Sequence, residues 1–329
     1  MYTFYIEEHE KNDATSFYIE IIKSAILKNN KEYREVSNVK LIKKNDIVIV
    51  ITVKTFFLTW IRNPKQRIYI WFQGIIPEEN MMMFKGYKKY IKYIYNTIFE
   101  KFAINNCEKA FFVSEAMYKH YNRKYGYKGN KHFIMPCFNQ ELDEKYFDDY
   151  KYQQPTFVYA GNLAQWQCVD KTLELFCKIK KCIPNAQITL LTKDKEKALK
   201  LAEKYDIKDI GIKYIPYTEL NNEMSKYKYG FLLREDTAVN NVATPTKMSS
   251  YMACGVIPIF SDVIGDFKNV FNDIKYKISV SSDEECIETI TNMEKVRLKG
   301  ADILDEFRKI FATYYSKDNY VNNIVKFFK

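Results

Sequence analysis

The chain has 329 residues, 47% of them hydrophobic and 28% charged. This excludes a disordered or fibrous protein and leaves room for two ordinary domains. The net charge is +10, and basic residues outnumber acidic ones by eight to three in 51–100 and by nine to four in 151–200. Such regions favour anionic partners (phosphates, lipid headgroups or nucleic acid), although for most individual lysines solvation is the better interpretation.

Cysteine and histidine usage argues against disulfide and metal frameworks. The seven cysteines are odd in number, scattered and without a C-x-x-C pair, and there are only three histidines. The N-terminal MYTFYIEEHEKND becomes acidic too early for a signal peptide, and the longest apolar run (47–53) is too short to span a bilayer. We expect a cytoplasmic protein that needs no metal or other cofactor.

Short apolar runs alternate with helical patterns along the whole chain, which is typical of parallel sheets covered by helices. In the first half, the pattern predicts strands at 3–6, 39–42, 46–52, 67–73, 109–114 and 132–136. It predicts helices at 13–29, 54–62, 78–104 and 115–125. The next segment, 137–155, is polar and acidic and ends in proline, which indicates a linker or domain boundary.

The second half repeats this alternation. Strands are predicted at 157–162, 188–192, 212–215, 229–233, 256–260 and 276–280, a helix at 169–182, and helix throughout after 282. We therefore predict an α/β fold of two doubly wound, Rossmann-like domains facing across a cleft, with ligands at the carboxyl ends of the strands. The predicted divisions are a first domain (1–140), a linker (141–155), a second domain (156–312) and a C-terminal helix (313–329) that crosses back to the first domain.

The most informative stretch runs from 232 to 260. Arg234 ends a predicted central strand, where ligands bind in open α/β sheets. Thr244 is a candidate N-cap of a helix over 245–253, with Gly255 as its terminator. The helix N-terminus, Arg234 and Lys247 together suit a diphosphate. Alternatively, Thr244 merely caps the helix and Lys247 is solvated. Gly161 and Asn162 follow the first strand of this half, where a plain turn glycine is the simpler interpretation.

At this point the sequence resembles a known family. The stretches VYAGNLAQWQCVDKTLEL (158–175) and LLREDTAVNNVATPTKMSSYMACGVIPI (232–259) are similar to the nucleotide-sugar domain of bacterial GT-B glycosyltransferases. The similarity is to the retaining, family-4-like type found in capsule and surface-polysaccharide clusters. WFQGIIPEEN (71–80), FFVSEAM (111–117) and IMPCFN (134–139) also look like that family. The resemblance covers most of residues 67–262, and its motifs are specific only as a set.

The resemblance implies a glycosyltransferase of the hexosyltransferase type. It would bind a nucleoside-diphosphate sugar in the second domain and a saccharide or lipid-linked acceptor in the first. Arg234 and Lys247 would neutralise the leaving diphosphate without a metal, and the sequence contains no Asp-x-Asp. The implied donor-binding residues are Gly161, Asn162, Arg234, Ala243, Thr244, Thr246, Lys247 and Ser250.

The chain departs from the family at Ser250, where a glutamate usually binds the ribose hydroxyls, and at Asn162 and Gln167, where Arg and Lys are frequent. These departures keep open a second class of function, a non-catalytic glycosyltransferase-like subunit that binds a saccharide or a partner. Nucleic-acid binding ranks low because no recognition-helix, RNP or zinc signature is found.

In the first half, Gln73 and Gly74 follow a predicted strand and are candidates for the acceptor side. Glu78 and Glu79 open the next helix. Either could hydrogen-bond or deprotonate an acceptor hydroxyl, but acidic residues also stabilise a helix N-terminus without any such role. His9 is expected in a surface loop and His120 on a helix face, so no catalytic base is assigned.

The predicted helix over 80–102 combines two faces. Lys85, Lys88, Lys89 and Lys92 share one, and Ile91, Tyr95, Ile98 and Phe102 share the other. The simpler interpretation places the apolar face in the core and the lysines in water. The alternative is an interfacial patch for anionic lipid, which would make the protein peripheral on the inner face of the cell membrane.

Overall fold

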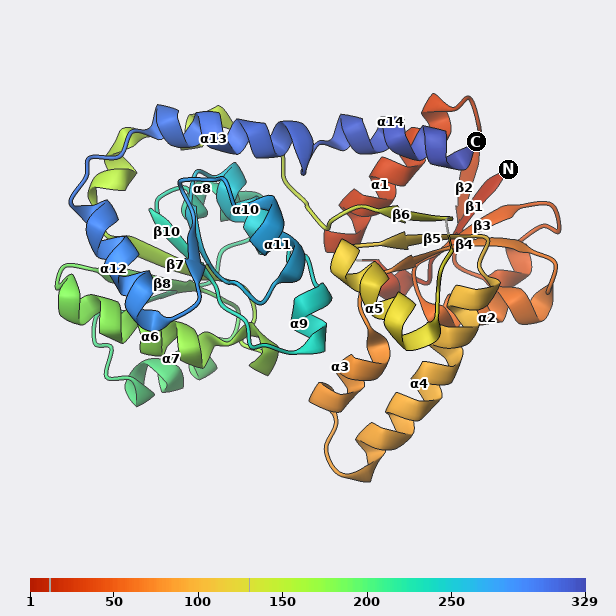
Figure 1. Cartoon of the computed structure of the whole chain (residues 1–329), viewed down its shortest axis with the longest axis horizontal. Coiled ribbons are helices and arrows are strands. Elements are labelled where there is room, and N and C mark those ends of the chain that lie inside the picture. Colours follow the sequence, from red (N-terminus) through yellow and green to blue (C-terminus); the bar gives the residue numbers. More distant parts are fainter. Residues whose placement is uncertain (12, 130) are drawn as a thin grey trace. The chain divides into compact units, whose positions relative to one another are not determined.

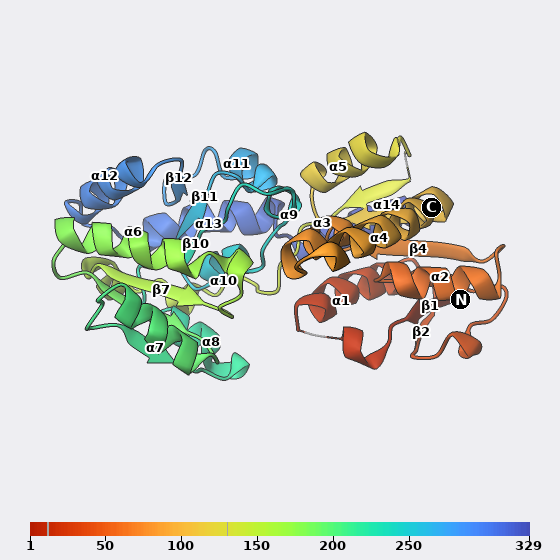
Figure 2. The ribbon, with the colours of Figure 1, turned by 90° about the horizontal axis from the view of Figure 1, so that it is seen from below.

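The computed structural model describes residues 1–11, 13–129 and 131–329, except the side chains of residues 13 and 14. These residues form two compact units. Unit 1 comprises residues 1–139, 241–244 and 316–329, and unit 2 comprises 140–240 and 245–315. Each unit contains a six-stranded, fully parallel sheet with helices on both faces (Figures 1 and 2). The short helix α9 (Ala238–Val242) spans the passage from one unit to the other.

The sheet of unit 1 has the strand order β2-β1-β3-β4-β5-β6. Its strands are β1 (Tyr2–Tyr5), β2 (Tyr33–Val36), β3 (Ile47–Val50), β4 (Arg67–Phe72), β5 (Lys109–Phe112) and β6 (His132–Ile134). Its helices are α1 (Asp13–Lys28), α2 (Val53–Arg62), α3 (Ile76–Met83), α4 (Tyr87–Asn106), α5 (Glu115–Tyr125) and α14 (Lys317–Phe328), with 3-10 turns η1 (Glu8–Glu10) and η2 (Val39–Leu41).

The sheet of unit 2 has the order β12-β11-β10-β7-β8-β9. Its strands are β7 (Thr156–Ala160), β8 (Gln187–Leu191), β9 (Gly211–Lys213), β10 (Tyr229–Leu232), β11 (Ile257–Ser261) and β12 (Ile278–Val280). Its helices are α6 (Val169–Cys182), α7 (Lys195–Lys204), α8 (Tyr217–Met224), α10 (Lys247–Ala253), α11 (Gly265–Val270), α12 (Asp283–Glu294) and α13 (Gly300–Thr313), with 3-10 turns η3 (Glu144–Tyr146), η4 (Asp149–Gln153) and η5 (Gln165–Gln167).

Two predicted elements of unit 1 are wrong. The run at 39–42 is not a strand, because the Asn38 side chain accepts from the Lys40 amide and the chain forms the turn η2. The edge strand is instead β2, whose Arg34 pairs with Asp46 at 2.7 Å. The helix predicted over 78–104 is divided into α3 and α4, because Gly86 has a φ of +63°, a left-handed conformation that ends one helix and redirects the chain into the next.

The order of the strands locates the ligand-binding edges. In unit 1 the strand order reverses between β1 and β3, and in unit 2 between β7 and β10. In open α/β sheets, ligands bind beyond the carboxyl ends of the strands at such a switch point. Residues that directly follow these four strands are therefore the first candidates for function in each unit.

Candidate functional site

Two cations meet at the switch point of unit 2. Arg234 follows β10, and Lys247 is the first residue of α10. Both donate hydrogen bonds to the side-chain oxygen of Gln167, at 2.9 Å from Arg234 Nη2 and 2.6 Å from Lys247 Nζ. The predicted convergence of these two cations is therefore present in the structure. The bridging role of Gln167 was not predicted.

The loop after β7 completes this group. Lys247 Nζ lies 3.1 Å from the Tyr159 hydroxyl and 4.3 Å from the centre of its ring. Gly161 has a φ of +143°, and a Cβ at this position would lie 3.0 Å from Lys247 Nζ. The backbone conformation therefore favours glycine, and a Cβ here would crowd the lysine. The Asn162 carbonyl accepts from the Tyr159 hydroxyl at 2.6 Å, which fixes this loop beside the cations.

The positive charge of this group is not neutralised inside the described part of unit 2. Neither Arg234 nor Lys247 forms an ion pair with a carboxylate there. Burial and the neighbouring Arg234 guanidinium lower the pKa of Lys247 well below its ordinary value, and burial also lowers the pKa of Arg234. Because an anion would relieve both the desolvation and the repulsion, the group is suited to bind one.

The prediction that Thr244 caps the following helix is wrong. Its hydroxyl donates to the Val113 carbonyl and accepts from the Cys137 amide within unit 1. Helix α10 begins at Lys247, with Thr246 at its N-cap, and not at Pro245. Gly255 terminates it in a left-handed conformation, as predicted.

The other predicted donor-binding residues near this helix have different surroundings. The Ser250 hydroxyl donates to the Thr246 carbonyl at 3.1 Å. Ala243, like Thr244, belongs to unit 1, and a role of either amide in binding phosphate stays a prediction.

Two pockets of unit 2 lie near Arg234, which lines the first, while its chain neighbour Glu235 lines the second. One, of about 280 Å³, is lined by Lys171, Glu174, Leu233, Arg234, Ser261, Val280 and Asp283. The other, of about 300 Å³, is lined by Leu163, Ala164, Gln165, Cys168, Val169, Asp170, Lys171, Lys197, Leu201 and Glu235. Lys171 borders both and pairs with Glu235 at 3.6 Å. The carboxylates and hydroxyl in these walls can accept from or donate to sugar hydroxyls.

Unit 1 contains a pocket of its own, of about 230 Å³. Its walls are formed by Ile51, Thr52, Val53, Trp71, Phe72, Gln73, Gly74, Ile76 and Glu79. A Cβ on Gly74 would lie 2.0 Å from Glu79 Oε1, so glycine is needed for the carboxyl to lie against the backbone. Burial raises the pKa of Glu79, and a hydrogen bond from the Ile75 backbone offsets this only in part. The predicted residues Gln73, Gly74 and Glu79 thus share one pocket.

Glu78 has different surroundings from Glu79. Its carboxylate lies 2.7 Å from Lys124 Nζ and 3.4 Å from His120 Nε2, both on α5. Burial opposes ionisation, but hydrogen bonds from His120 and Lys124 outweigh it and hold the pKa of Glu78 below its ordinary value. The ion pair with Lys124 gives Glu78 a structural role. Glu79 is therefore the better placed of the two for acceptor chemistry.

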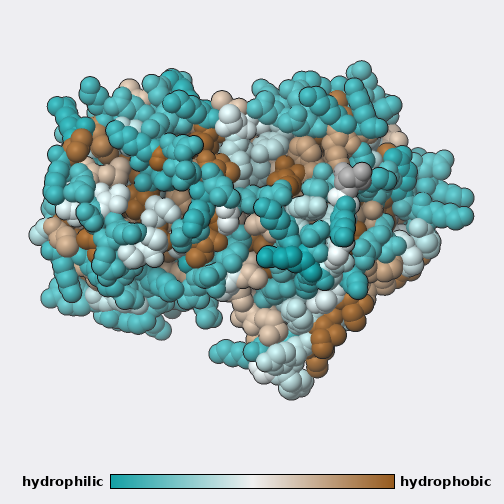
Figure 3. Space-filling model, in the orientation of Figure 1, coloured by the Kyte–Doolittle hydropathy of each residue, from teal (hydrophilic) through white to brown (hydrophobic). Residues whose placement is uncertain are grey.

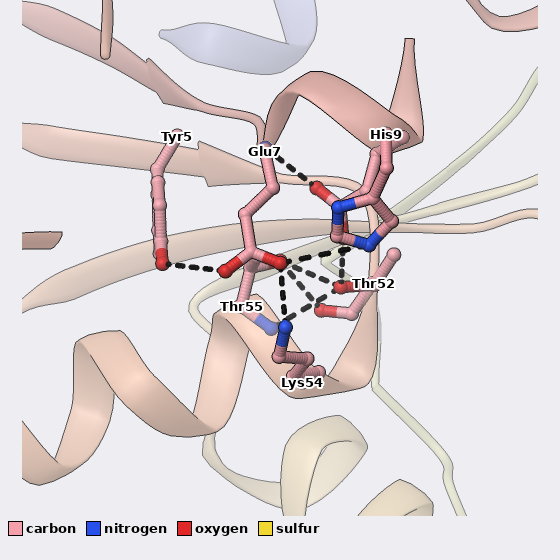
Figure 4. Close-up of polar contacts among 7 residues, drawn as sticks. Tyr5, Glu7, His9, Thr52, Lys54 and Thr55 are labelled. Carbon is pink, nitrogen blue, oxygen red and sulfur yellow. Dashed lines mark hydrogen bonds and ion pairs between the residues drawn. The ribbon is translucent and has the colours of Figure 1, made fainter. Parts of the chain in front are cut away.

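A polar cluster that was not predicted lies at the switch point of unit 1 (Figure 4). Glu7, just after β1, accepts from Lys54 Nζ at 2.6 Å, and the exposed His9 approaches the same carboxylate at 3.7 Å. Glu10 accepts from the Thr52 hydroxyl at 2.8 Å, and Thr52 also borders the pocket. The available signal was positional, because Glu7 directly follows the predicted strand at 3–6 and Thr52 ends the predicted strand at 46–52.

The cluster could be considered for a metal, because ligand atoms of Glu7, His9 and Glu10 lie within 4.8 Å of one another. The Lys54 ammonium already neutralises Glu7, however, and lowers the pKa of its carboxyl. Glu10 in turn accepts from the Glu7 amide at 2.9 Å. A lysine-neutralised turn accounts for this geometry better than a cation site does.

Comparison with known proteins identifies the fold. A scan against protein-family models and a search of curated proteins both find no match. Among solved structures, 292 chains match. Together with the two parallel sheets they show that the chain has the GT-B fold of two Rossmann-like domains, as predicted. No helix within the described ranges combines the length and apolar character that crossing a membrane requires.

Three of these structures illustrate the similarity. An S. aureus TarM mutant in complex with fondaparinux, alpha-GlcNAc-glycerol and UDP has a TM-score of 0.65 at 15% identity, covering 88% of this chain and 57% of TarM. Sucrose-phosphate synthase from Thermosynechococcus elongatus has a TM-score of 0.70 at 10% identity, covering 99% of this chain and 98% of the synthase. A UDP-forming alpha,alpha-trehalose-phosphate synthase from Burkholderia vietnamiensis has a TM-score of 0.62 at 9% identity, covering 97% and 78%.

Proposed function

We propose that this chain is a glycosyltransferase that moves a sugar from a nucleoside-diphosphate sugar to a saccharide or lipid-linked acceptor. The observation that supports this most is the unneutralised pair Arg234 and Lys247 at the switch point of unit 2. Two cations with open hydrogen-bonding capacity can bind a diphosphate and stabilise its charge as it leaves. Side-chain cations in this position make the transfer independent of a metal.

The pockets beside Arg234 are the proposed place of the nucleoside and the sugar. Ser250 bonds to its own helix, and a hydroxyl replaces the carboxylate that the resembled family uses for ribose. Glu174 and Asp283 in one pocket and Glu235 in the other supply carboxylates that can bind ribose hydroxyls instead. UDP is the first nucleotide to test, because the TarM complex contains UDP and the trehalose-phosphate synthase is UDP-forming.

The unit 1 pocket is the proposed acceptor site. Its mixture of aromatic walls, amide and carboxyl groups suits a saccharide, which presents both apolar ring faces and hydroxyls. Glu79 would accept a hydrogen bond from the reacting hydroxyl. Burial raises the pKa of Glu79, which makes its carboxylate a stronger proton acceptor than an exposed one. By the sequence resemblance alone, transfer would retain the anomeric configuration and serve surface-polysaccharide synthesis.

Donor binding and turnover test the proposal separately. A thermal-shift screen against UDP, GDP, CMP and ADP sugars should identify one donor that raises the melting temperature. With that donor, Arg234→Ala and Lys247→Ala should each lower the rate of transfer or donor hydrolysis by about 10²-fold or more. Lys181→Ala, at an exposed lysine in the last turn of α6, is the control and should have no effect.

The outcomes distinguish the two classes of function. Rates unaffected by both substitutions would refute the assigned site. Nucleotide binding that needs both cations, without turnover on any acceptor or by hydrolysis, would favour the non-catalytic subunit. Glu79→Gln should lower transfer while leaving the nucleotide Kd unchanged, because Glu79 and the cations belong to different units. A change in Kd alone would remove Glu79 from the acceptor side.

A further inference from the structure

Helix α4 presents an apolar stripe to the outside of unit 1. Tyr87, Ile91, Ile94 and Ile98 follow one another at helical spacing, and each is between 59% and 71% exposed. Tyr90 and Tyr95 extend the stripe on both sides and are also exposed. Figure 3 shows hydrophobic colour along the flank of the projection that α3 and α4 form in Figure 1. The interpretation that placed Ile91, Tyr95 and Ile98 in the core is therefore wrong.

The inward face of the same helix combines the apolar Phe102, Ala103 and Ile104 with polar side chains. Glu100 is only 1% exposed and accepts from the Tyr125 hydroxyl at 2.6 Å, and Asn96 and Thr97 are half-buried. A surface helix ordinarily has a polar outer face, whereas the outer face of α4 is apolar. The stripe on α4 gains little from folding of the described chain, because most of its apolar surface stays exposed and would be stabilised by an external surface.

Lysines accompany the stripe. Lys85, Lys88 and Lys92 are exposed and Lys89 is half-buried, and no acidic residue occurs between 80 and 99. Two of the ammonium groups lie over aromatic rings, with Lys92 Nζ 4.3 Å from the Phe84 ring and Lys89 Nζ 4.9 Å from the Tyr90 ring. A surface that covers the stripe must accept apolar side chains and the positive charges of the lysines beside them.

We propose that α4 is a docking surface for the headgroup region of a membrane containing anionic lipid. Isoleucines would enter the acyl boundary, tyrosines would lie at the headgroup level, and lysines would contact lipid phosphates. A second copy of the chain fits less well, because a symmetric contact would bring two sets of four lysines together without carboxylates between them. The inference goes beyond glycosyl transfer, since lipid binding can be measured without donor or acceptor.

Co-sedimentation of the full chain with vesicles tests the inference. We expect binding to vesicles of phosphatidylcholine with about one third phosphatidylglycerol, and binding weaker by about tenfold or more to phosphatidylcholine alone. The stripe variant Ile91→Ser/Ile94→Ser/Ile98→Ser and the lysine variant Lys85→Gln/Lys88→Gln/Lys89→Gln/Lys92→Gln should each lower the partition coefficient by about tenfold or more. Added salt should weaken binding of the stripe variant more completely than that of the unchanged chain, because only charge attraction remains.

Matched controls use exposed residues of unit 2. The triple variant Leu199→Ser/Tyr214→Ser/Val296→Ser removes three exposed apolar side chains, and Lys193→Gln/Lys195→Gln/Lys200→Gln/Lys208→Gln removes four exposed lysines. Both should bind vesicles like the unchanged chain. Circular dichroism and melting temperature should be unchanged in the stripe and lysine variants, because the altered side chains are largely outside the core.

Three results would overturn the inference. One is the absence of binding to anionic vesicles. A second is binding that the control variants lower as much as the α4 variants do. The third is a concentration-dependent dimer in sedimentation velocity that the stripe variant abolishes, without vesicle binding, which would assign the stripe to a second copy. Loss of vesicle binding in the α4 variants with unchanged nucleotide binding would separate this surface from the proposed donor site.

Discussion

At the scale of single residues, Gln167 holds two cations with one neutral oxygen. Its Oε1 accepts from Arg234 at 2.9 Å and from Lys247 at 2.6 Å, so it partly satisfies charges that would otherwise repel one another. A diphosphate would compete for the same donors with a stronger, charged acceptor. Under the proposed function, Gln167 would be a positioning residue that keeps the site assembled before a nucleotide binds.

This role predicts a specific effect of adding charge. Gln167→Glu should place a carboxylate between the cations, raise the melting temperature of the free chain and weaken UDP binding about tenfold or more. Isothermal titration of UDP and a thermal scan without nucleotide measure the two effects. Gln187→Glu, at the start of β8, adds the same charge elsewhere and should change neither quantity. A Gln167→Glu chain that binds UDP normally would show that Arg234 and Lys247 do not hold the diphosphate.

The residues of this site differ in how well the sequence predicts them. Arg234 follows a recognisable strand and Lys247 lies at the start of a recognisable helix, so the positions of both could be predicted. The bridge through Gln167 could not, because it joins side chains 67 and 80 positions apart in the sequence. Thr244 matches an N-cap pattern, but its hydroxyl is used by Val113 and Cys137, 131 and 107 positions away. Tertiary hydrogen bonds of this kind override the local preference of threonine for an N-cap.

At the scale of elements, α4 shows what periodicity leaves open. The spacing of Ile91, Tyr95 and Ile98 identifies an apolar face, but it does not state whether that face is turned inward. In the structure the inward face carries Glu100, whose burial is compensated by Tyr125 and by Lys124, 3.9 Å away. Prediction of this orientation would have required knowing that α5 supplies polar partners to α4.

Glu100 makes stability depend on pH. Burial raises the pKa of its carboxyl to about 7 from an ordinary value of 4.5. The folded chain therefore binds more protons than the unfolded chain between these values, and stability from this group is lost as the pH rises from 4.5 through 7. Glu100→Gln should remove this loss. Its stability gain over the unchanged chain should grow across that window and level off at roughly 3 kcal/mol above pH 7.

Urea unfolding at a series of pH values measures this difference. Glu196→Gln, at an exposed carboxylate on α7, is the matched control and should follow the unchanged chain at every pH. A Glu100→Gln chain whose stability advantage does not vary between pH 4.5 and 7 would show that Glu100 is ionised in the folded state throughout.

At the scale of the whole molecule, the chain returns twice to unit 1. Residues 241–244 enter it from α9, and 316–329 enter it as α14, which packs on α1 (Figure 1). The return of the terminal helix was predicted, because the last segment, SKDNYVNNIVKFFK, was expected to cross back and pack on the first domain. The short return at 241–244 has no such signal, since it depends on Ser114 donating to the Val242 carbonyl at 2.6 Å.

Unit 1 should consequently depend on the far end of the chain. Phe328 stacks on Tyr2 at 5.3 Å between ring centres, and Val321 and Ile324 are buried beside it. Removal of residues 316–329 would lose the burial of these three side chains, roughly 5–9 kcal/mol, which is comparable with the whole stability of a domain. We expect the truncated chain to unfold in unit 1 while unit 2 still binds UDP, as measured by limited proteolysis and titration.

Single substitutions in α14 test its contribution to the stability of unit 1 in smaller steps. Phe328→Ala should lower the free energy of unfolding of unit 1 by about 3–5 kcal/mol, whereas Lys326→Ala, at an exposed position of the same helix, should leave it nearly unchanged. Tryptophan fluorescence reports mainly on unit 1, because Trp60 and Trp71 belong to it, Trp71 is buried against Tyr18, and only Trp166 belongs to unit 2. If the truncated chain keeps a protease-resistant unit 1 with native fluorescence, α14 is dispensable for its folding. Loss of UDP binding on truncation would instead mean that the two units fold as one.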